Sequence, residues 1–352
     1  MMNHASEFSS TSVASAIDRC SSIGKWRFAS GIAFTLVALA TSVGAAEPPA
    51  TTPPPADRPV AQRPAATLSN VPYGDHPRQV LDFWKAPSTK PTPVVIHIHG
   101  GGWEAGSKGF VPGTAEFLAA GISVVSISYR YTWQAQADGV SPPVSAPLHD
   151  AARALQFVRS KAAEWNIDKT RIGATGSSAG ACSSLWLAFH DDMADPKSAD
   201  PVARESTRLF CAAVDTAQTS LDPQQMKEWT PNSRYGAHAF GFAEASATHA
   251  RSQDAMFADF LAHRNDVLPW IKEYSPIEHV TRDDPPIYMI YPAAPSLGQP
   301  QPDPTHTANF GVKLQEKLKS LNVECELVYP GAPDVKHLSI AVYLIEKLRL
   351  AP

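Results

Sequence analysis

Short apolar runs rich in Val and Ile alternate with helical patterns from about residue 92 to the end of the chain. The first run, VVIHIH, is apolar on both faces, as expected of a strand inside a parallel sheet. The pattern predicts strands at 94–99, 122–128, 171–175, 209–214, 287–291 and 323–329. It predicts helices at 114–120, 147–166, 179–189, 310–321 and 338–350. This regular alternation indicates an α/β fold, a three-layer sandwich with a mostly parallel central sheet.

One long segment interrupts the alternation. About seventy residues separate the strands at 209–214 and 287–291, and they carry Trp229, Tyr235, Phe240, Phe242, Phe257, Phe260 and Trp270. We expect a helical, cap-like insertion at about 217–275 that forms a wall of the binding cleft. The alternative is additional packing that only covers the sheet.

The N-terminal region has the pattern of a targeting segment. Lys25-Trp26-Arg27 precedes the apolar run 28–40, and small residues follow at 43–46. This pattern predicts a signal peptide at 1–46 and export to the periplasm or the medium. Residues 47–69 are rich in proline and predict a linker before the main domain at 70–352. The alternative to export is an uncleaved membrane anchor, the one case in which a membrane partner is expected.

Composition narrows the possible partners. The 352 residues include 30 Lys and Arg against 34 Asp and Glu, a net charge of -4 that argues against nucleic acid. The share of hydrophobic residues, 43%, is enough for a large core. Cys182, Cys211 and Cys325 are too sparse for a disulfide framework, although one pair remains open. The chain has no CxxC or HExxH motif, so no cofactor or catalytic metal is expected. The oligomeric state stays open.

A nucleophile motif joins the strand at 171–175 to the helix at 179–189. Gly176-Ser177-Ser178-Ala179-Gly180 fits G-x-S-x-G, with Ser178 at the centre. A nucleophile on such a tight strand-to-helix turn has strained backbone angles, and side chains two residues to either side would collide. The turn also directs a helix N-terminus at Ser178, which favours developing negative charge. Ser178 is therefore the candidate nucleophile.

A glycine loop follows the strand at 94–99. His99-Gly100-Gly101-Gly102-Trp103 exposes backbone N–H groups that can approach a substrate oxygen. We assign the oxyanion hole to the N–H groups of Gly101, Gly102 and Ala179. A phosphate-binding loop is disfavoured because the chain has neither G-x-x-x-x-G-K-[ST] nor G-x-G-x-x-G before a helix.

Several motifs together resemble a known family. HGGGW at 99–103, SYR at 128–130, DAA at 150–152, G-x-S-x-G, and SP at 275–276 before DPPI at 284–287 are similar to hormone-sensitive-lipase-like and related carbohydrate-ester esterases of the α/β-hydrolase fold. The resemblance covers roughly residues 70–350. It implies serine-dependent ester hydrolysis with the chain order Ser, acid, His.

The resemblance places the histidine in a loop after the last strand. His337 lies there, between the strand at 323–329 and the final helix, and is the predicted general base; His306 is the alternative. The acid of the relatives comes a few residues after the penultimate strand, where this chain has PAAPS at 292–296 and no carboxylate. Asp303 is the predicted acid, with Asp215 and Asp222 as alternatives. Asp334 is too close in sequence to His337 to orient its ring.

These assignments predict an exported serine carboxylesterase with Ser178, His337 and Asp303 as its triad. Its substrate would be a small-molecule or carbohydrate ester, with carbohydrate acetyl or aryl esters as candidates. Two alternatives remain. One is a peptidase of the same fold. The other is a non-catalytic binding protein, suggested by the missing acid at its usual place.

Overall fold

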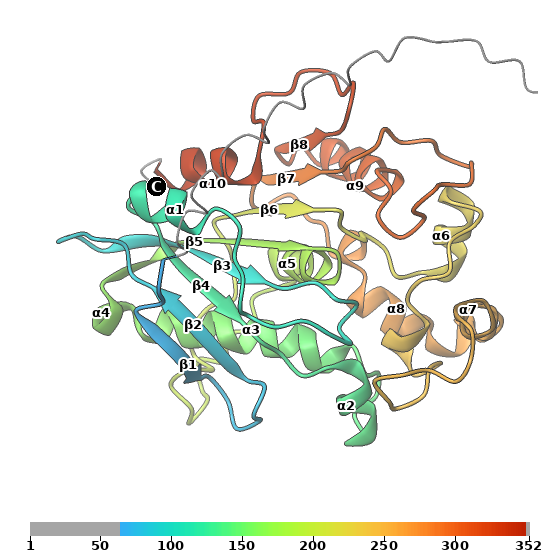
Figure 1. Cartoon of the computed structure of the whole chain (residues 1–352), viewed down its shortest axis with the longest axis horizontal. Helices are drawn as coiled ribbons and strands as arrows, with labels where there is room; N and C mark the ends of the chain where they lie inside the picture. The colour runs from blue at the N-terminus through green and yellow to red at the C-terminus, as the bar shows by residue number, and fades with distance from the viewer. Residues whose placement is uncertain (1–63, 350–352) are drawn as a thin grey trace, which may run out of the picture. The chain divides into compact units, whose positions relative to one another are not determined.

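An eight-stranded sheet forms the centre of the protein (Figure 1). The computed structural model of the protein describes residues 64–349. The strand order is β1-β2-β4-β3-β5-β6-β7-β8, and only β1–β2 and β2–β4 pair antiparallel. The strands are β1 (Leu68–Pro72), β2 (Val80–Trp84), β3 (Thr92–Ile98), β4 (Ser123–Ile127), β5 (Ile167–Ser177), β6 (Cys211–Asp215), β7 (Ile287–Ile290) and β8 (Cys325–Val328).

Helices cover both faces of this sheet. Helices α3 (Ser145–Ser160), α4 (Ala162–Trp165), α5 (Ala179–Phe189) and α9 (Asn309–Ser320) contribute to the larger apolar core. Helices α1 (Thr114–Ala119) and α10 (Ile340–Arg349) pack on the other face, in a separate cluster of buried side chains. The short helix α2 (Thr132–Ala137) follows β4. The result is a three-layer sandwich.

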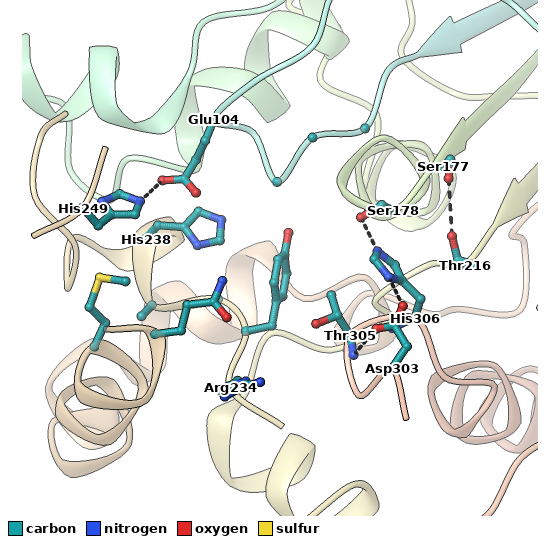
Figure 2. A pocket seen from close by; sticks show the side chains of 18 of the residues that line it. Glu104, Ser177, Ser178, Thr216, Arg234, His238, His249, Asp303, Thr305 and His306 are labelled. Carbon is teal, nitrogen blue, oxygen red and sulfur yellow. Dashed lines mark hydrogen bonds and ion pairs between the residues drawn. The ribbon is translucent and has the colours of Figure 1, made fainter. Parts of the chain in front are cut away.

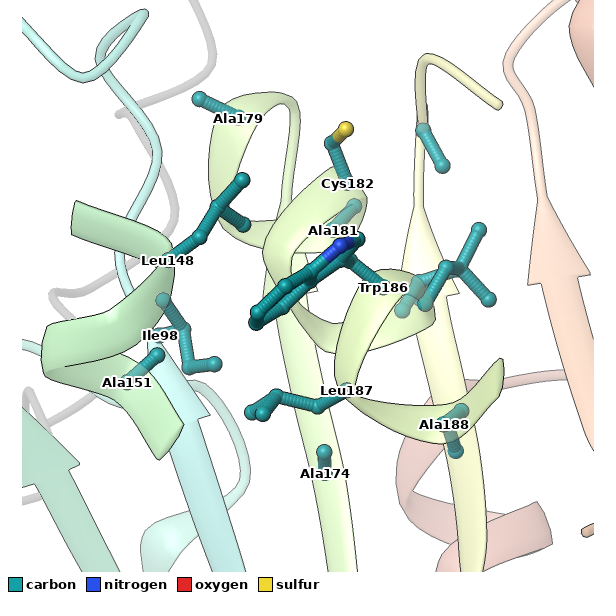
Figure 3. Close-up of a cluster of buried hydrophobic side chains, with 14 of the residues drawn as sticks. Ile98, Leu148, Ala151, Ala174, Ala179, Ala181, Cys182, Trp186, Leu187 and Ala188 are labelled. Atoms are coloured by element: carbon teal, nitrogen blue, oxygen red, sulfur yellow. The ribbon is translucent and has the colours of Figure 1, made fainter. Parts of the chain in front are cut away.

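Helix α5 is buried along its whole length, since every residue from Ala179 to Phe189 is inaccessible or nearly so. Its sequence is apolar or small on all sides, which is typical of a helix enclosed by a core. Figure 3 shows Trp186 and Leu187 of this helix among side chains from α3, β3 and β5. The first turn of α5, which directly follows the candidate nucleophile Ser178, is therefore held in a rigid setting.

The insertion between β6 and β7 is helical. It contains α6 (Pro223–Trp229), η1 (Ala237–Phe240), α7 (Gln253–Ala262), η2 (Arg264–Val267), α8 (Leu268–Tyr274) and η3 (Pro276–Glu278). Figure 1 places α6, α7 and α8 beyond the carboxyl ends of the parallel strands. In an open α/β sheet this is the end at which ligands bind.

The predicted fold class is confirmed, with differences in detail. The expected helix at 147–166 is divided into α3 and α4 at Lys161. The strands β1 and β2 and the helix α2 were not predicted, and residues 68–69 of the expected linker belong to β1. The predicted signal peptide and linker residues 47–63 lie outside the described residues. Cys182, Cys211 and Cys325 are free thiols. Within residues 64–349, every helix is too short or too polar to cross a bilayer.

Candidate active site

Ser178 occupies a sharp turn between β5 and α5. Its backbone has φ 54° and ψ −124°, a strained conformation for a residue with a side chain. A Cβ atom on Gly176 would lie 2.5 Å from the carbonyl carbon of Gly180, and one on Gly180 would lie 2.0 Å from the Ile98 carbonyl oxygen. Only glycine fits at these two positions, which explains why the motif needs both.

His306 supplies the imidazole beside Ser178. Its Nε2 lies 2.9 Å from Ser178 Oγ, and its Nδ1 lies 2.8 Å from Asp303 Oδ2 (Figure 2). The other carboxylate oxygen of Asp303 accepts hydrogen bonds from the backbone N–H groups of Thr305 (3.1 Å) and His306 (3.2 Å). Asp303, Thr305 and His306 all belong to the loop between β7 and α9. One loop therefore places both an imidazole and its carboxylate partner beside Ser178.

The electrostatics of this loop keep Asp303 ionised. Partial burial raises the pKa of its carboxyl group, but hydrogen bonds from the His306 ring and from two backbone N–H groups hold the pKa below its usual value. An ionised Asp303 fixes the His306 proton on Nδ1 and leaves Nε2 free to accept the Ser178 hydrogen.

The structure does not bring His337 to Ser178, so the predicted partner of Ser178 is corrected to His306. His337 follows β8, where the resemblance requires a histidine, but its Nδ1 lies 2.6 Å from Glu326 Oε2 and its Nε2 lies 3.1 Å from Glu346 Oε2. The Tyr288 hydroxyl donates to the His337 carbonyl oxygen at 3.1 Å. Glu326 on β8 and Glu346 on α10 thus hold His337 at the face of the sheet covered by α10.

His337 should affect stability in a pH-dependent way. Burial alone would lower its pKa, but the hydrogen bonds and charges of Glu326 and Glu346 raise it above the usual value. A raised folded-state pKa stabilises the protein below the unfolded pKa of about 6.5, and the effect is lost as the pH rises through the folded pKa. We expect His337→Ala to lower the free energy of unfolding by about 1–3 kcal/mol at pH 5.5 and by less at pH 9.

Urea unfolding of the two proteins at pH 5.5, 7 and 9 measures this difference. An equal loss at every pH would contradict the charged pairing of His337.

The two alternative acids have other partners. Asp215 ends β6 and accepts a hydrogen bond from Ser177 Oγ at 3.3 Å; burial raises its pKa, against a smaller lowering by that bond. Asp222 caps α6 by accepting from the Gln224 N–H at 2.9 Å, and it also accepts from Nε and Nη2 of Arg264, at 2.7 and 2.5 Å. Neither carboxylate hydrogen-bonds to a histidine.

The glycine loop forms the wall of the cavity opposite the His306 loop. Gly101 and Gly102 have φ values of 97° and 63°, and both line the cavity together with Ser178. Tyr129 holds the start of this loop in place. Its hydroxyl donates to the His99 carbonyl oxygen (2.7 Å), and the Tyr129 ring stacks on the His99 ring. Ala179, the third predicted oxyanion donor, is the first residue of α5, where helix N–H groups have no intrahelical acceptor.

The cavity extends well beyond the serine, with a volume of about 790 Å³. The side of the cavity far from Ser178 is polar, and we call it the polar wall. It is lined by Glu104, directly after the glycine loop, and by residues of the insertion: Arg234, Tyr235, His238, His249 and Gln253. His249 Nε2 lies 2.7 Å from Glu104 Oε1, which ties the insertion to the loop (Figure 2). Among the described residues, Tyr235 Oη and His238 Nε2 are buried without a hydrogen-bond partner.

From the sequence, His306 ranked second to His337. The insertion was expected to form a wall of the cleft, and it does, but the polar residues of that wall were not identified. One signal for His306 was present: Asp303 and His306 stand three residues apart in one loop between a strand and a helix. Glu104 directly follows HGGGW, but its partner His249 is 145 residues away. Nothing local in the sequence connects them.

A strained serine, a neighbouring His-Asp pair and a glycine loop at the carboxyl end of a parallel sheet define a protein of the α/β-hydrolase fold with a serine-hydrolase type of site. The family comparison agrees. The chain belongs to the BD-FAE family, whose model matches residues 81–296.

Curated relatives include two proteins named as esterases of Mycobacterium tuberculosis. Esterase LipQ is 28% identical over 241 residues, which cover 64% of this chain and 48% of LipQ. Esterase LipC is 29% identical over 232 residues, which cover 62% of this chain and 49% of LipC. The chain therefore spans about half the length of these relatives.

Solved structures agree on the fold. A truncated carbohydrate esterase from gut microbiota superposes with a TM-score of 0.55 at 20% identity, covering 80% of this chain and 95% of that one. Esterase 2 of Thermogutta terrifontis, phosphonylated by sarin, superposes with a TM-score of 0.54 at 22% identity, covering 76% and 84%. At these identities the similarity establishes the fold alone.

Proposed function

We propose that this protein is a serine carboxylesterase with a Ser178-His306-Asp303 triad. The observation that carries the proposal is the continuous hydrogen-bonded chain from Asp303 through His306 to Ser178, at 2.8 and 2.9 Å, at the edge of a large cavity. Membership of the BD-FAE family and the esterase names of the relatives support the same activity.

The acylation step follows from this arrangement. Ser178 Oγ attacks the ester carbonyl carbon while His306 Nε2 takes the hydroxyl proton. The carbonyl oxygen becomes an oxyanion, which the N–H groups of Gly101, Gly102 and Ala179 stabilise. His306 then gives its proton to the leaving alcohol as the carbon–oxygen bond breaks, and an acyl-serine remains.

Deacylation repeats the steps with water. His306 removes a proton from a water molecule, whose oxygen attacks the acyl-serine carbonyl carbon. The second oxyanion forms in the same hole, and its collapse releases the carboxylic acid as His306 returns the proton to Ser178 Oγ. The ionised Asp303 stabilises the imidazolium in both halves of the cycle.

The polar wall supports a hydroxylated substrate. Glu104, Tyr235, His238 and His249 offer donors and acceptors across the cavity from the triad, as the alcohol part of a carbohydrate ester requires. The proposed substrates are therefore carbohydrate acetyl or aryl esters. Turnover of acetylated methyl glycosides, methyl ferulate and ethyl acetate, which all have unactivated leaving groups, tests this: a higher kcat/KM for the acetylated glycosides or for methyl ferulate is expected, and an equal or higher kcat/KM for ethyl acetate argues against it.

The two other functions have less support. The non-catalytic alternative rested on the missing acid, and Asp303 now lies within hydrogen-bond distance of His306. No feature of the cavity favours a peptide over another acyl compound.

The acid assignment gives a specific expectation. Asp303→Asn should lower kcat by about 10²- to 10⁴-fold, because an amide can hold the imidazole in the wrong tautomer. Asp215→Asn and Asp222→Asn are matched controls and should change kcat less than about tenfold, since neither carboxylate contacts His306 by a hydrogen bond. Steady-state hydrolysis of p-nitrophenyl acetate measures all three. A large loss of kcat in either control, with little loss in Asp303→Asn, would mean that Asp215 or Asp222 is the acid and Asp303 is not.

Export remains part of the proposal. It rests on the basic, apolar and small-residue pattern at 25–46. N-terminal sequencing of the protein from its native host should find a mature chain that begins near residue 46 or 47; an intact leader would favour the membrane anchor.

A further inference from the structure

A cluster of three side chains lies at the far end of α5 from the candidate nucleophile. His190 follows the last residue of α5, Glu273 lies in the last turn of α8, and His279 follows η3. One ligand atom from each of the three residues lies within 4.8 Å of those of the other two. Two imidazoles and a carboxylate are a donor set that suits Zn²⁺ and other divalent transition metals.

Backbone carbonyls fix the proton on each ring. His190 Nδ1 lies 2.9 Å from the Asp191 carbonyl oxygen, and His279 Nε2 lies 2.6 Å from the Glu273 carbonyl oxygen. A carbonyl oxygen only accepts, so both nitrogens carry hydrogen. The lone pairs of the neutral rings therefore reside on His190 Nε2 and His279 Nδ1. Metal-binding histidines usually donate their other N–H to a carbonyl or carboxylate in this way.

The contact between the His190 ring and the Glu273 carboxylate joins two hydrogen-bond acceptors. His190 Nε2 lies 3.1 Å from Glu273 Oε1. In the neutral tautomer both atoms carry lone pairs, so a positive charge is needed between them. Two tetrahedral Zn²⁺ ligands with bonds of about 2.0–2.1 Å are about 3.3 Å apart, close to the distance in this pair.

The surroundings hold the three residues together without a metal. The Glu273 carbonyl oxygen that accepts from His279 also accepts from the buried Trp186 indole N–H at 2.8 Å. The rings of His190 and His279 are 4.9 Å apart, and the His190 ring packs at 4.6 Å from Trp186. The Glu273 side chain is 46% exposed, which leaves an entry path for an ion.

We propose that His190, Glu273 and His279 bind a divalent transition-metal ion of the Zn²⁺ class. The ion would link the end of α5 to the segment that closes the insertion. Since His190 follows Ser178 by twelve residues across α5, the site is about 18 Å from Ser178 along the helix, so its role is to hold the fold and not to act in ester hydrolysis. The HExxH and CxxC motifs could not reveal it, because its ligands are at positions 190, 273 and 279.

Calorimetric titration of the chelator-treated full chain with ZnCl₂ tests the proposal. We expect one Zn²⁺ per chain with a dissociation constant below about 100 µM, and a higher Tm with Zn²⁺ present. His190→Ala and His279→Ala should each weaken binding about 100-fold and remove the Tm increase. MgCl₂ should not replace ZnCl₂, because Mg²⁺ prefers oxygen ligands.

Two control variants separate this site from other histidines. His263 lies near the carboxylates of Asp259 and Asp266, and His306 lies near Asp303. His263→Ala and His306→Ala should both retain wild-type Zn²⁺ affinity. If the wild-type protein binds no Zn²⁺ up to about 1 mM, about tenfold above the expected dissociation constant, the proposal is wrong. The contact between His190 and Glu273 would then be an ordinary ion pair with a protonated ring. Unchanged binding in a folded His190→Ala/His279→Ala variant would also overturn the proposal.

Discussion

Replacing Ser178 with alanine should lower kcat for ester hydrolysis by about 10⁴- to 10⁶-fold, because the variant has no nucleophile and retains only the oxyanion hole and substrate binding. The fold should survive, since Ser178 Oγ contacts His306 at the cavity surface and contributes little to the core. Alanine keeps the Cβ atom, so the backbone strain at this position is unchanged and Tm should stay close to that of the wild type. Rates with p-nitrophenyl acetate and a thermal melt measure both effects.

Ser177→Ala is the matched control for this change. Ser177 is adjacent in sequence, but its hydroxyl contacts Asp215 and Thr216 at 3.3 Å each and does not reach His306. We expect most of the activity to remain. If Ser177→Ala were inactive and Ser178→Ala active, the position of the nucleophile within the motif would be wrong.

Replacing His306 with alanine should lower kcat by a similar factor, about 10⁴- to 10⁶-fold. Within residues 64–349, no other side chain that could take the proton hydrogen-bonds to Ser178 Oγ. The double variant Ser178→Ala/His306→Ala should be no slower than either single variant, since the two residues act as a unit. The same ester assay measures this non-additivity.

His337→Ala is the control that separates the two histidines. Its ring is held between Glu326 and Glu346, so the variant should keep kcat within a few-fold of wild type at pH 7.5. An inactive, folded His337→Ala together with an active His306→Ala would reverse the assignment made from the structure.

The nucleophile turn and the glycine loop could be predicted because their constraints are local. Gly176 and Gly180 are required by contacts with neighbours of the same turn and with the end of β3, and each lies two residues from Ser178 in the sequence. The alternation of parallel strands and helices is also a local signal. Both features were therefore available from the chain alone.

The histidine could not be predicted in the same way. His306 and His337 each lie in a loop between a late strand and the following helix, and sequence position alone does not say which loop turns towards Ser178. Both histidines have a carboxylate partner: Glu326 and Glu346 bind His337, and Asp303 binds His306 within its own loop. A nearby acid therefore does not separate them, and only the fold shows which ring reaches Ser178.

The antiparallel edge was missed for another reason. Strand β1 has the sequence LSNVP, and most of its residues are exposed, so it lacks the alternation that marks a strand with one buried face. It exists because β2 pairs with it, and β2 in turn pairs with β4. Such tertiary pairing overrides weak local preference.

Labelling with a fluorophosphonate probe tests the central claim most directly. The probe reacts with a serine that an adjacent base activates, and peptide mass spectrometry identifies the modified residue. We predict stoichiometric labelling of Ser178 in the wild-type protein and in His337→Ala, and little or none in Ser178→Ala or His306→Ala. A folded wild-type protein that stays unlabelled, or one labelled as strongly after His306→Ala, would contradict a Ser178-His306 catalytic pair.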